Sequence, residues 1–257
     1  MRKTLVNSGL LIAIVLSGSA CGSDKVASAP TAKVKVNTLT VLAASSLTKA
    51  FTALATEFEA AHPGTNVQLS FGSSTDLERQ VEQGAAADVF ASADQKNMNK
   101  LVKSGGNLGA PVNFARNKLT IAVAKGNPKH IANMQSLTAS GLVVVLCDAA
   151  VPCGKFADQV LGNAAVKLTP KSREPSVRAT LNKVELGEAD AAIVYASDVA
   201  TSRKVDAVAI PDAINVVTDL PIATLKGSKN VAVAQLWVTF VSAHEADLVQ
   251  RFGFVAR

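Results

Sequence analysis

Three hydroxyl side chains of this sequence stand where predicted strands end. Ser46 and Ser74 each follow closely on an apolar run, and Tyr195 ends a third run. Taken singly, each has an ordinary explanation: a serine before a helix is usually its N-cap, and a tyrosine is often a half-buried core residue. Taken together, hydroxyl donors that converge could hold an anion without any charged side chain.

Backbone N–H groups could add to this set of donors. At strand ends, helices are predicted to open at Ser46, at Thr75 and directly after Pro152. The first turn of a helix has N–H groups without partners and the positive end of the helix dipole. Several such helix ends that meet at one point form an anion site.

The elements that must position these donors alternate between strand and helix. A loop with Gly105, Gly106, Gly109 and Pro111 separates the third helix from the fourth strand. Parallel sheets with helices on both faces follow from this order, and their ligands bind at the carboxyl ends of strands. The predicted strands are 38–44, 66–71, 88–91, 119–124, 142–147, 191–195, 205–210 and 222–225. The predicted helices begin near 46, 75, 94, 152, 176, 231 and 246.

The N-terminus reads as an export signal. Arg2 and Lys3 precede the apolar run 10–16, which is too short to span a membrane, and small residues lead to Cys21. We expect a lipoprotein signal peptide over 1–20 and lipidation of Cys21, with plain cleavage nearby as the alternative. Residues 21–37 are polar and contain proline, which is typical of a flexible tether to the membrane.

Composition excludes several functions. The net charge is +6, but the cations are scattered and aromatic residues make up only 4%, so nucleic-acid binding is not expected. His62, His130 and His244 are isolated in the sequence, which argues against a zinc site.

With Cys21 assigned to the lipid, Cys147 and Cys153 remain, and a disulfide between them is expected in an oxidising compartment.

At this point a resemblance becomes specific. The sequence is similar to the periplasmic molybdate-binding proteins of bacterial ABC importers, in order from Thr38 to Phe254. The motifs that carry the resemblance are AASSL at 43–47, FGSSTDLERQVEQGAAADVFASADQ at 71–95, VPCGKFA at 151–157, SVRATLNKVELGEADAAIVYASD at 176–198 and RFGF at 251–254.

The resemblance implies a set of ligand-binding residues. Members of the family hold their oxyanion with two serines, two backbone N–H groups and a tyrosine, which would be Ser46, Ser74, Cys153, Val177 and Tyr195 here. Ser73 stays open as the second serine. The position of Cys153 is alanine in one member of the family, but a backbone donor does not depend on its side chain.

The resemblance also implies a fold. It is α/β, the two-lobed periplasmic-binding-protein fold of type II, with mixed, mostly parallel sheets and the ligand in the cleft between the lobes. Lobe one would comprise 38–115 plus 222–257 and lobe two 116–221, with crossings near 115–117 and 220–221. We expect an exported monomer on the outer face of the cytoplasmic membrane or in the periplasm, with permease subunits of an ABC importer as partners and no cofactor.

The hydrogen-bonding character of these five groups limits which anions can be the ligand. Because all five groups are donors, a protonated anion such as hydrogen phosphate would lack an acceptor, at a cost of about 1–3 kcal/mol. Fully deprotonated dianions are therefore favoured: molybdate or tungstate, with sulfate as the alternative. This holds if Asp148 and Glu174 face away from the site.

Two other classes of function fit the sequence less well. A hydrolase using Ser46 or Ser74 is disfavoured, because the sequence has no G-x-S-x-G motif and no histidine in the motif loops. A structural lipoprotein would leave the donor positions unexplained.

Overall fold

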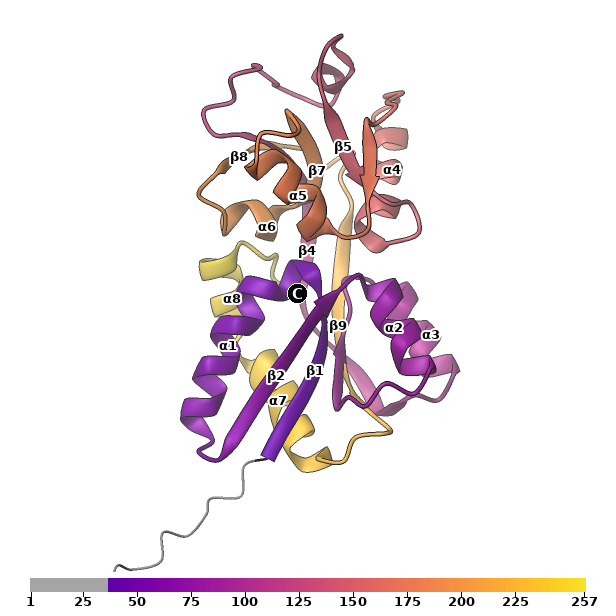
Figure 1. Ribbon diagram of the computed structural model, residues 1–257, viewed down its shortest axis with the longest axis vertical. Helices are drawn as coiled ribbons and strands as arrows, with labels where there is room; N and C mark the ends of the chain where they lie inside the picture. The colour runs from indigo at the N-terminus through magenta and orange to yellow at the C-terminus, as the bar shows by residue number, and fades with distance from the viewer. Residues whose placement is uncertain (1–36) are drawn as a thin grey trace, which may run out of the picture. The chain divides into compact units, whose positions relative to one another are not determined.

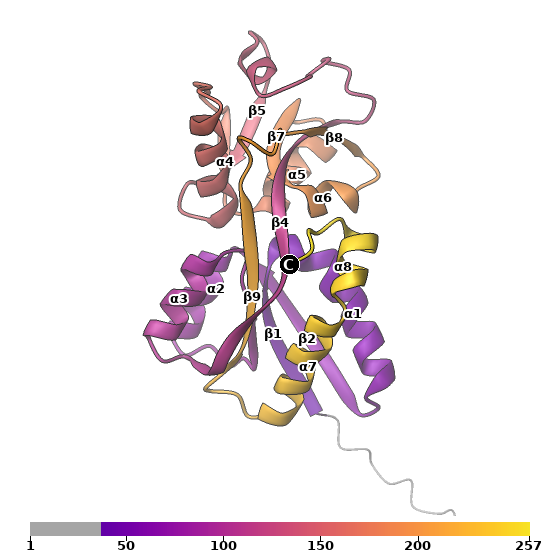
Figure 2. The same ribbon diagram turned by 180° about the vertical axis from the view of Figure 1, so that it is seen from behind.

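The computed structural model describes residues 37–257, which lie within one compact unit, Lys35–Arg257. The predicted signal peptide, the lipidation site Cys21 and the tether up to residue 36 lie outside the described residues, whereas Asn37, predicted to end the tether, is the first residue of β1. Within that unit, two lobes are joined by the long strands β4 (Asn107–Ala124) and β9 (Val217–Leu225), which pass from one to the other (Figures 1 and 2).

Lobe 1 is built on the strands β1, β2 and β3. Two sets of helices cover its sheet, α1, α7 and α8 on one face and α2 and α3 on the other (Figure 1). Its strands are β1 (Asn37–Ala44), β2 (Thr65–Gly72) and β3 (Val89–Ala91). Its helices are α1 (Thr48–Ala61), α2 (Ser74–Glu82), α3 (Gln95–Lys103), α7 (Val231–Ala243) and α8 (Glu245–Phe252).

The alternation of side chains along β1 explains the two layers. Val41 belongs to the large core cluster that contains Phe51 and Trp237, whereas Leu42 belongs to a second cluster with Leu77 of α2. Because successive side chains of a strand point to opposite faces, one apolar strand supports helices on both sides.

Lobe 2 has the same layered construction. Its strands are β5 (Val144–Cys147), β6 (Ser172–Glu174), β7 (Ala191–Tyr195) and β8 (Val205–Ala209). Its helices are α4 (Pro152–Asn163), α5 (Val177–Glu185) and α6 (Ala196–Ala200). Strands β5 and β7 are buried along their whole lengths, as expected for strands covered on both faces.

The sheet order through both lobes is β2-β1-β3-β9-β4-β7-β5-β6, with β8 paired to β4. The predicted mixed α/β fold is confirmed, but parallel pairing does not predominate in the described chain. Four strand pairs are parallel and four antiparallel, because every pair made by the crossing strands β4 and β9 is antiparallel. Ala115 pairs with Leu220, so the predicted crossings near 115–117 and 220–221 fall within these two strands.

One predicted loop is wrong. The segment with Gly109 and Pro111 belongs to β4, which begins at Asn107 and pairs with β9. The pairing shifts register between Leu108 and Val112, and Gly109 has a φ of 73°. A bulge accommodates glycine and proline inside a strand, so these residues mark an irregularity in β4 and not its absence.

Candidate functional site

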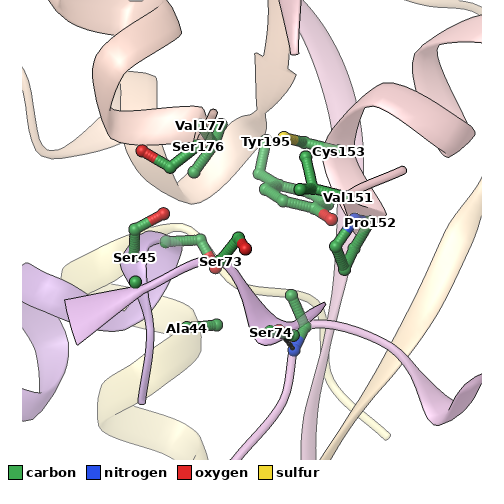
Figure 3. A pocket seen from close by; sticks show the side chains of 13 residues that line it. Ala44, Ser45, Ser73, Ser74, Val151, Pro152, Cys153, Ser176, Val177 and Tyr195 are labelled. Atoms are coloured by element: carbon green, nitrogen blue, oxygen red, sulfur yellow. Dashed lines mark hydrogen bonds between the residues drawn. The ribbon is translucent and has the colours of Figure 1, made fainter. Parts of the chain in front are cut away.

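A pocket lies between the lobes at the carboxyl ends of β1, β2 and β7. Tyr195, Cys153 and Val177 line it from lobe 2, and Ser45 and Ser74 face them from lobe 1 (Figure 3). The space inside it is about 210 Å³ with open solvent included, so it suits a small solute. Its lining residues are Ala44, Ser45, Ser46, Gly72, Ser73, Ser74, Ala93, Val151, Pro152, Cys153, Ser176, Val177 and Tyr195.

Ser46 enters the pocket from a short helical turn. The 3-10 segment Ser45–Leu47 follows β1 directly, and neither it nor α1 has a side-chain N-cap. Ser46 is only 7% exposed, and its Oγ has no hydrogen-bond partner among the described residues. A buried hydroxyl without a partner is uncommon, and it is explained if the group donates to a ligand.

Ser73 and Ser74 have different tasks. Ser73 is the N-cap of α2: its Oγ accepts from the Asp76 backbone N–H at 3.1 Å and donates to the Asp76 carboxylate at 2.6 Å. The Ser74 Oγ accepts from the Ala93 backbone N–H at 2.9 Å, which leaves its own proton available. Among the contacts of residues 37–257, the Ser73 hydroxyl donates to Asp76, whereas the Ser74 hydroxyl keeps a proton that can point into the pocket.

Two helix N-termini form the wall on lobe 2. Pro152 is the first residue of α4, and Cys153 and Gly154 follow it in the first turn. Val177 is the first residue of α5, after the N-cap Ser176. N–H groups at these positions have no partner four residues back within their helices. Cys153 and Val177 are 3% exposed, so a ligand in the pocket could receive both donors away from water.

Tyr195 ends β7, and its ring points across the pocket toward lobe 1 (Figure 3). The side chain is 1% exposed, and its Oη has no partner among the described residues. Burial raises the pKa of the Tyr195 hydroxyl well above its usual range, and the nearby carboxylates of Asp94 and Asp198 raise it further. The hydroxyl therefore keeps its proton and can act as a donor.

None of the residues that line the pocket within 37–257 has a charged side chain. Asp148 is exposed and Glu174 is half-buried, and neither lines the pocket, in agreement with the prediction that both face away. What remains in the wall is a set of hydroxyl and N–H donors with two helix dipoles. Such a site stabilises negative charge.

Asp198 lies close behind this pocket. It lines a neighbouring polar cavity together with Ser45, Ser46, Lys49 and Arg178, and one of its carboxylate oxygens has no partner in the described chain. Burial raises the pKa of Asp198 to about 7, against opposing effects of a hydrogen bond with the Tyr195 backbone and of the Arg178 cation.

The structure brings all five predicted ligand-binding positions to this one pocket. The predicted disulfide between Cys147 and Cys153 is confirmed and ties the first turn of α4 to the end of β5. Ser176 also lines the pocket, and its Oγ accepts from the Ala179 N–H at 3.3 Å. The resemblance implied only Val177 at this point, although a serine before a predicted helix is a recognisable N-cap signal.

One histidine is less isolated than its sequence position suggests. His244 lies near Glu57 and Asp247, close enough for the three to share a metal ion. Arg251, however, pairs with Glu57 at 2.9 Å and with Asp247 at 3.9 Å, so the two carboxylates already have a cationic partner. None of these three residues lines the pocket.

Comparisons with known sequences indicate that the chain is a solute-binding protein. Residues 39–255 match the family model of the bacterial extracellular solute-binding proteins. The chain is 42% identical to the molybdate-binding protein ModA of Mycobacterium tuberculosis over an alignment of 246 residues, which covers 95% of this chain and 94% of that protein.

No helix among residues 37–257 is long and apolar enough to cross a membrane.

Solved structures share the fold. The periplasmic molybdate-binding protein of Azotobacter vinelandii superposes with a TM-score of 0.75 at 23% identity, over 85% of this chain and 99% of that one. The sulfate-binding protein SubI of Mycobacterium tuberculosis gives a TM-score of 0.72 at 20% identity, over 86% and 93%. At these identities the likeness shows the two-lobed architecture alone.

Proposed function

Since the chain belongs to the bacterial extracellular solute-binding proteins and is related throughout its length to molybdate-binding members, we propose that it captures molybdate or tungstate. It acts outside the cytoplasm and delivers the oxyanion to the permease of an ABC importer. The single observation that carries the choice of an anion is the wall of the pocket, which offers hydroxyl and N–H donors and no charged side chain within the described residues.

In this proposal five groups donate to one ion. Ser46, Ser74 and Tyr195 contribute hydroxyl protons, and Cys153 and Val177 contribute backbone N–H groups. Two buried hydroxyls, Ser46 Oγ and Tyr195 Oη, have no partner among residues 37–257, which supports their part. The hydrogen bond from Ser73 to Asp76 favours Ser74 over Ser73 as the second serine.

The same donors select the protonation state of the ligand. A monoprotonated oxyanion carries one O–H that needs an acceptor, whereas a fully deprotonated dianion presents acceptors only. No carboxylate lines the described pocket to receive that proton. Hydrogen phosphate should therefore bind more weakly than molybdate, by about 1–3 kcal/mol or roughly fivefold to a hundredfold.

Binding without catalysis is part of the proposal. A hydrolytic serine needs a general base within hydrogen-bond reach, and none of the described lining residues is a histidine or a carboxylate. We also propose that the chain works as a monomer, without a cofactor, and that it is anchored by lipid at Cys21. Palmitate labelling of the exported protein, with Cys21→Ala as control, tests the anchor.

Thermal melting of the soluble chain from Thr38 tests the ligand class. A ligand at about 100 times its dissociation constant raises the free energy of unfolding by about 2.7 kcal/mol. We expect molybdate and tungstate to raise the melting temperature, sulfate to raise it less, and amino acids and sugars to leave it unchanged. A shift caused by a sugar or an amino acid and not by molybdate would contradict the assignment.

A further inference from the structure

Cys147 lies outside the pocket, but it contacts α4 and α5, the two helices whose first turns supply the backbone N–H donors of the pocket. It is the last residue of β5 and is fully buried. Its disulfide with Cys153 holds the first turn of α4. Its Sγ also lies 3.2 Å from the hydroxyl of Thr180, which is in the first turn of α5, three residues after Val177.

The Thr180 hydroxyl is shared between two neighbours. It also lies 3.0 Å from the Ser176 carbonyl oxygen, so the same group holds the N-cap of α5 against its own first turn. Cys147 is itself fixed, because Arg173 Nη1 donates to its carbonyl oxygen at 2.9 Å. The sulfur of Cys147 is thus a fixed point between the N-termini of α4 and α5.

The disulfide also closes the segment 148–152, which faces the other lobe. Val151 and Pro152 of this segment line the pocket. The Ala150 carbonyl oxygen accepts from Thr75 Oγ1 of α2 at 3.0 Å, a hydrogen bond between the two lobes. The conformation of this short segment therefore affects both the wall of the pocket and the contact between the lobes.

We propose that Cys147 is a positioning residue for anion binding, which sets the separation of the Cys153 and Val177 N–H groups through its disulfide and its contact with Thr180. The proposal rests on the proposed function, since it concerns the donors of that site. Two donors that are already held at a fixed separation lose little conformational entropy when the ion binds. A loosened turn must first be ordered, and this entropy loss lowers the affinity.

Affinity should consequently depend on the redox state of this disulfide. Reduction by a dithiol transfers two electrons and two protons, so that the S–S bond is replaced by two thiols and the dithiol becomes a cyclic disulfide. The covalent tie between β5 and α4 is then lost, while all five proposed donor groups remain in the chain. A loss of affinity on reduction would thus report on positioning and not on removal of a ligand-binding group.

The experiment compares redox states of the same chain. Wild-type protein is reduced with dithiothreitol, freed of reductant under anaerobic conditions and titrated with molybdate beside the oxidised protein. We expect affinity to fall about tenfold, the contribution of one hydrogen bond to a charged group, and to return on reoxidation. The double variant Cys147→Ala/Cys153→Ala should reproduce the reduced state and should not respond to reductant.

A control separates positioning from stability. Leu161→Ala removes a buried side chain from the far end of α4 and should lower the melting temperature while leaving molybdate affinity unchanged. Thr180→Val keeps the disulfide and removes the hydroxyl beside Cys147. It should weaken binding by about threefold, as the loss of one weak hydrogen bond would.

The outcomes are distinguishable. If the oxidised protein does not bind molybdate, the proposed function fails. If it binds, and the reduced protein and the double variant bind within twofold of it, Cys147 is only a structural staple and the proposal is overturned. Should neither disulfide-free form remain folded by circular dichroism, Thr180→Val decides: unchanged affinity would overturn the proposal, and a threefold loss would support it.

Discussion

Tyr195 combines a buried ring with a hydroxyl that has no partner in the described chain, and this makes it the sharpest residue to test. Tyr195→Phe removes one oxygen and keeps the packing of the ring. We expect molybdate affinity to fall about tenfold to a hundredfold, the effect of losing one donor to a charged ligand. The melting temperature of the ligand-free protein should stay the same or rise slightly, because an unsatisfied buried group has been removed. Calorimetric titration and melting of the same sample measure both.

A tyrosine that served only the core would give the opposite pattern in this variant. Stability of the ligand-free protein would fall and affinity would be kept. That result would remove Tyr195 from the proposed site.

Substitutions of the two adjacent serines should have different effects on stability and on molybdate affinity. Ser73→Ala removes the N-cap of α2 and should lower the free energy of unfolding by about 1 kcal/mol, with a smaller effect on affinity. Ser74→Ala should weaken molybdate binding by about tenfold or more. It also leaves the Ala93 N–H without its acceptor, so some stability is lost as well. The ratio of the two dissociation constants is the readout, and a larger loss of affinity in Ser73→Ala would reverse the assignment.

Asp198 predicts a pH dependence of stability. Burial raises the pKa of its carboxyl group to about 7 in the folded protein, from an ordinary value of 3.8. The folded state therefore binds the proton more tightly than the unfolded state, and the ionised form destabilises the fold. The cost is full above about pH 7, on the order of 4 kcal/mol, and disappears as the pH falls from about 7 to about 4.

Asp198→Asn removes this titration while keeping an oxygen for the hydrogen bond with the Tyr195 backbone. We expect the variant to melt at a higher temperature than the wild type at pH 8 and at nearly the same temperature at pH 4. Melting curves across this range provide the test. An equal shift at both pH values would mean that ionisation of Asp198 does not contribute.

At the scale of elements, the N-terminus of α4 depends on a close backbone contact. A Cβ atom at Gly154 would lie 1.9 Å from the Asp148 carbonyl oxygen and 2.6 Å from that of Cys147. Both neighbours are backbone atoms, so the helix would have to move away from β5. We expect Gly154→Ala to lower both stability and molybdate affinity, the latter by about tenfold or more, because the Cys153 N–H moves with the helix.

The same helix offers a matched control. A Cβ atom at Gly162 would meet nothing within 4 Å, so Gly162→Ala adds a methyl group in open space. It should keep affinity and raise stability by up to about 1 kcal/mol, from helix propensity. Equal binding by both alanine variants would show that the contact of Gly154 with Asp148 does not position the donor.

Much of this element level could be predicted from the sequence. The helix predicted to begin near 231 does begin at Val231, and the apolar run that ends at Tyr195 is the buried strand β7. The bulged start of β4 was missed because Gly109 and Pro111 locally resemble a loop, whereas pairing with β9 is a long-range effect. The short strand β6 was missed for the same reason, since three residues carry no periodic signal.

The candidate site was partly predictable for a different reason. Strand ends and helix starts can be read locally, which placed Ser46, Ser74 and Tyr195 at suitable positions, whereas Cys153 and Val177 were implied by the resemblance. Local patterns did not reveal that Ser73 and not Ser74 caps α2, because that depends on side-chain orientation. Nor could they reveal Asp198, whose burial follows from the packing of α6 against β4, β7 and β8.

At the scale of the whole molecule, both lobes contribute donors to one pocket. Ser46 and Ser74 belong to lobe 1, and Cys153, Val177 and Tyr195 belong to lobe 2, while β4 and β9 connect the lobes. An ion that contacts both lobes stabilises the arrangement in which they lie together, because an open arrangement would lose part of these contacts. Ligand binding and closure of the lobes are then thermodynamically coupled.

Isothermal titration of the oxidised soluble chain with molybdate, at fixed pH and with hydrogen phosphate as competitor, tests the central claim most directly. We expect saturable binding of one molybdate ion per chain, with phosphate at equal concentration displacing only a minor share of it. Absence of binding to molybdate and tungstate, or equal competition by hydrogen phosphate, would contradict a donor-lined site that selects a fully deprotonated oxyanion.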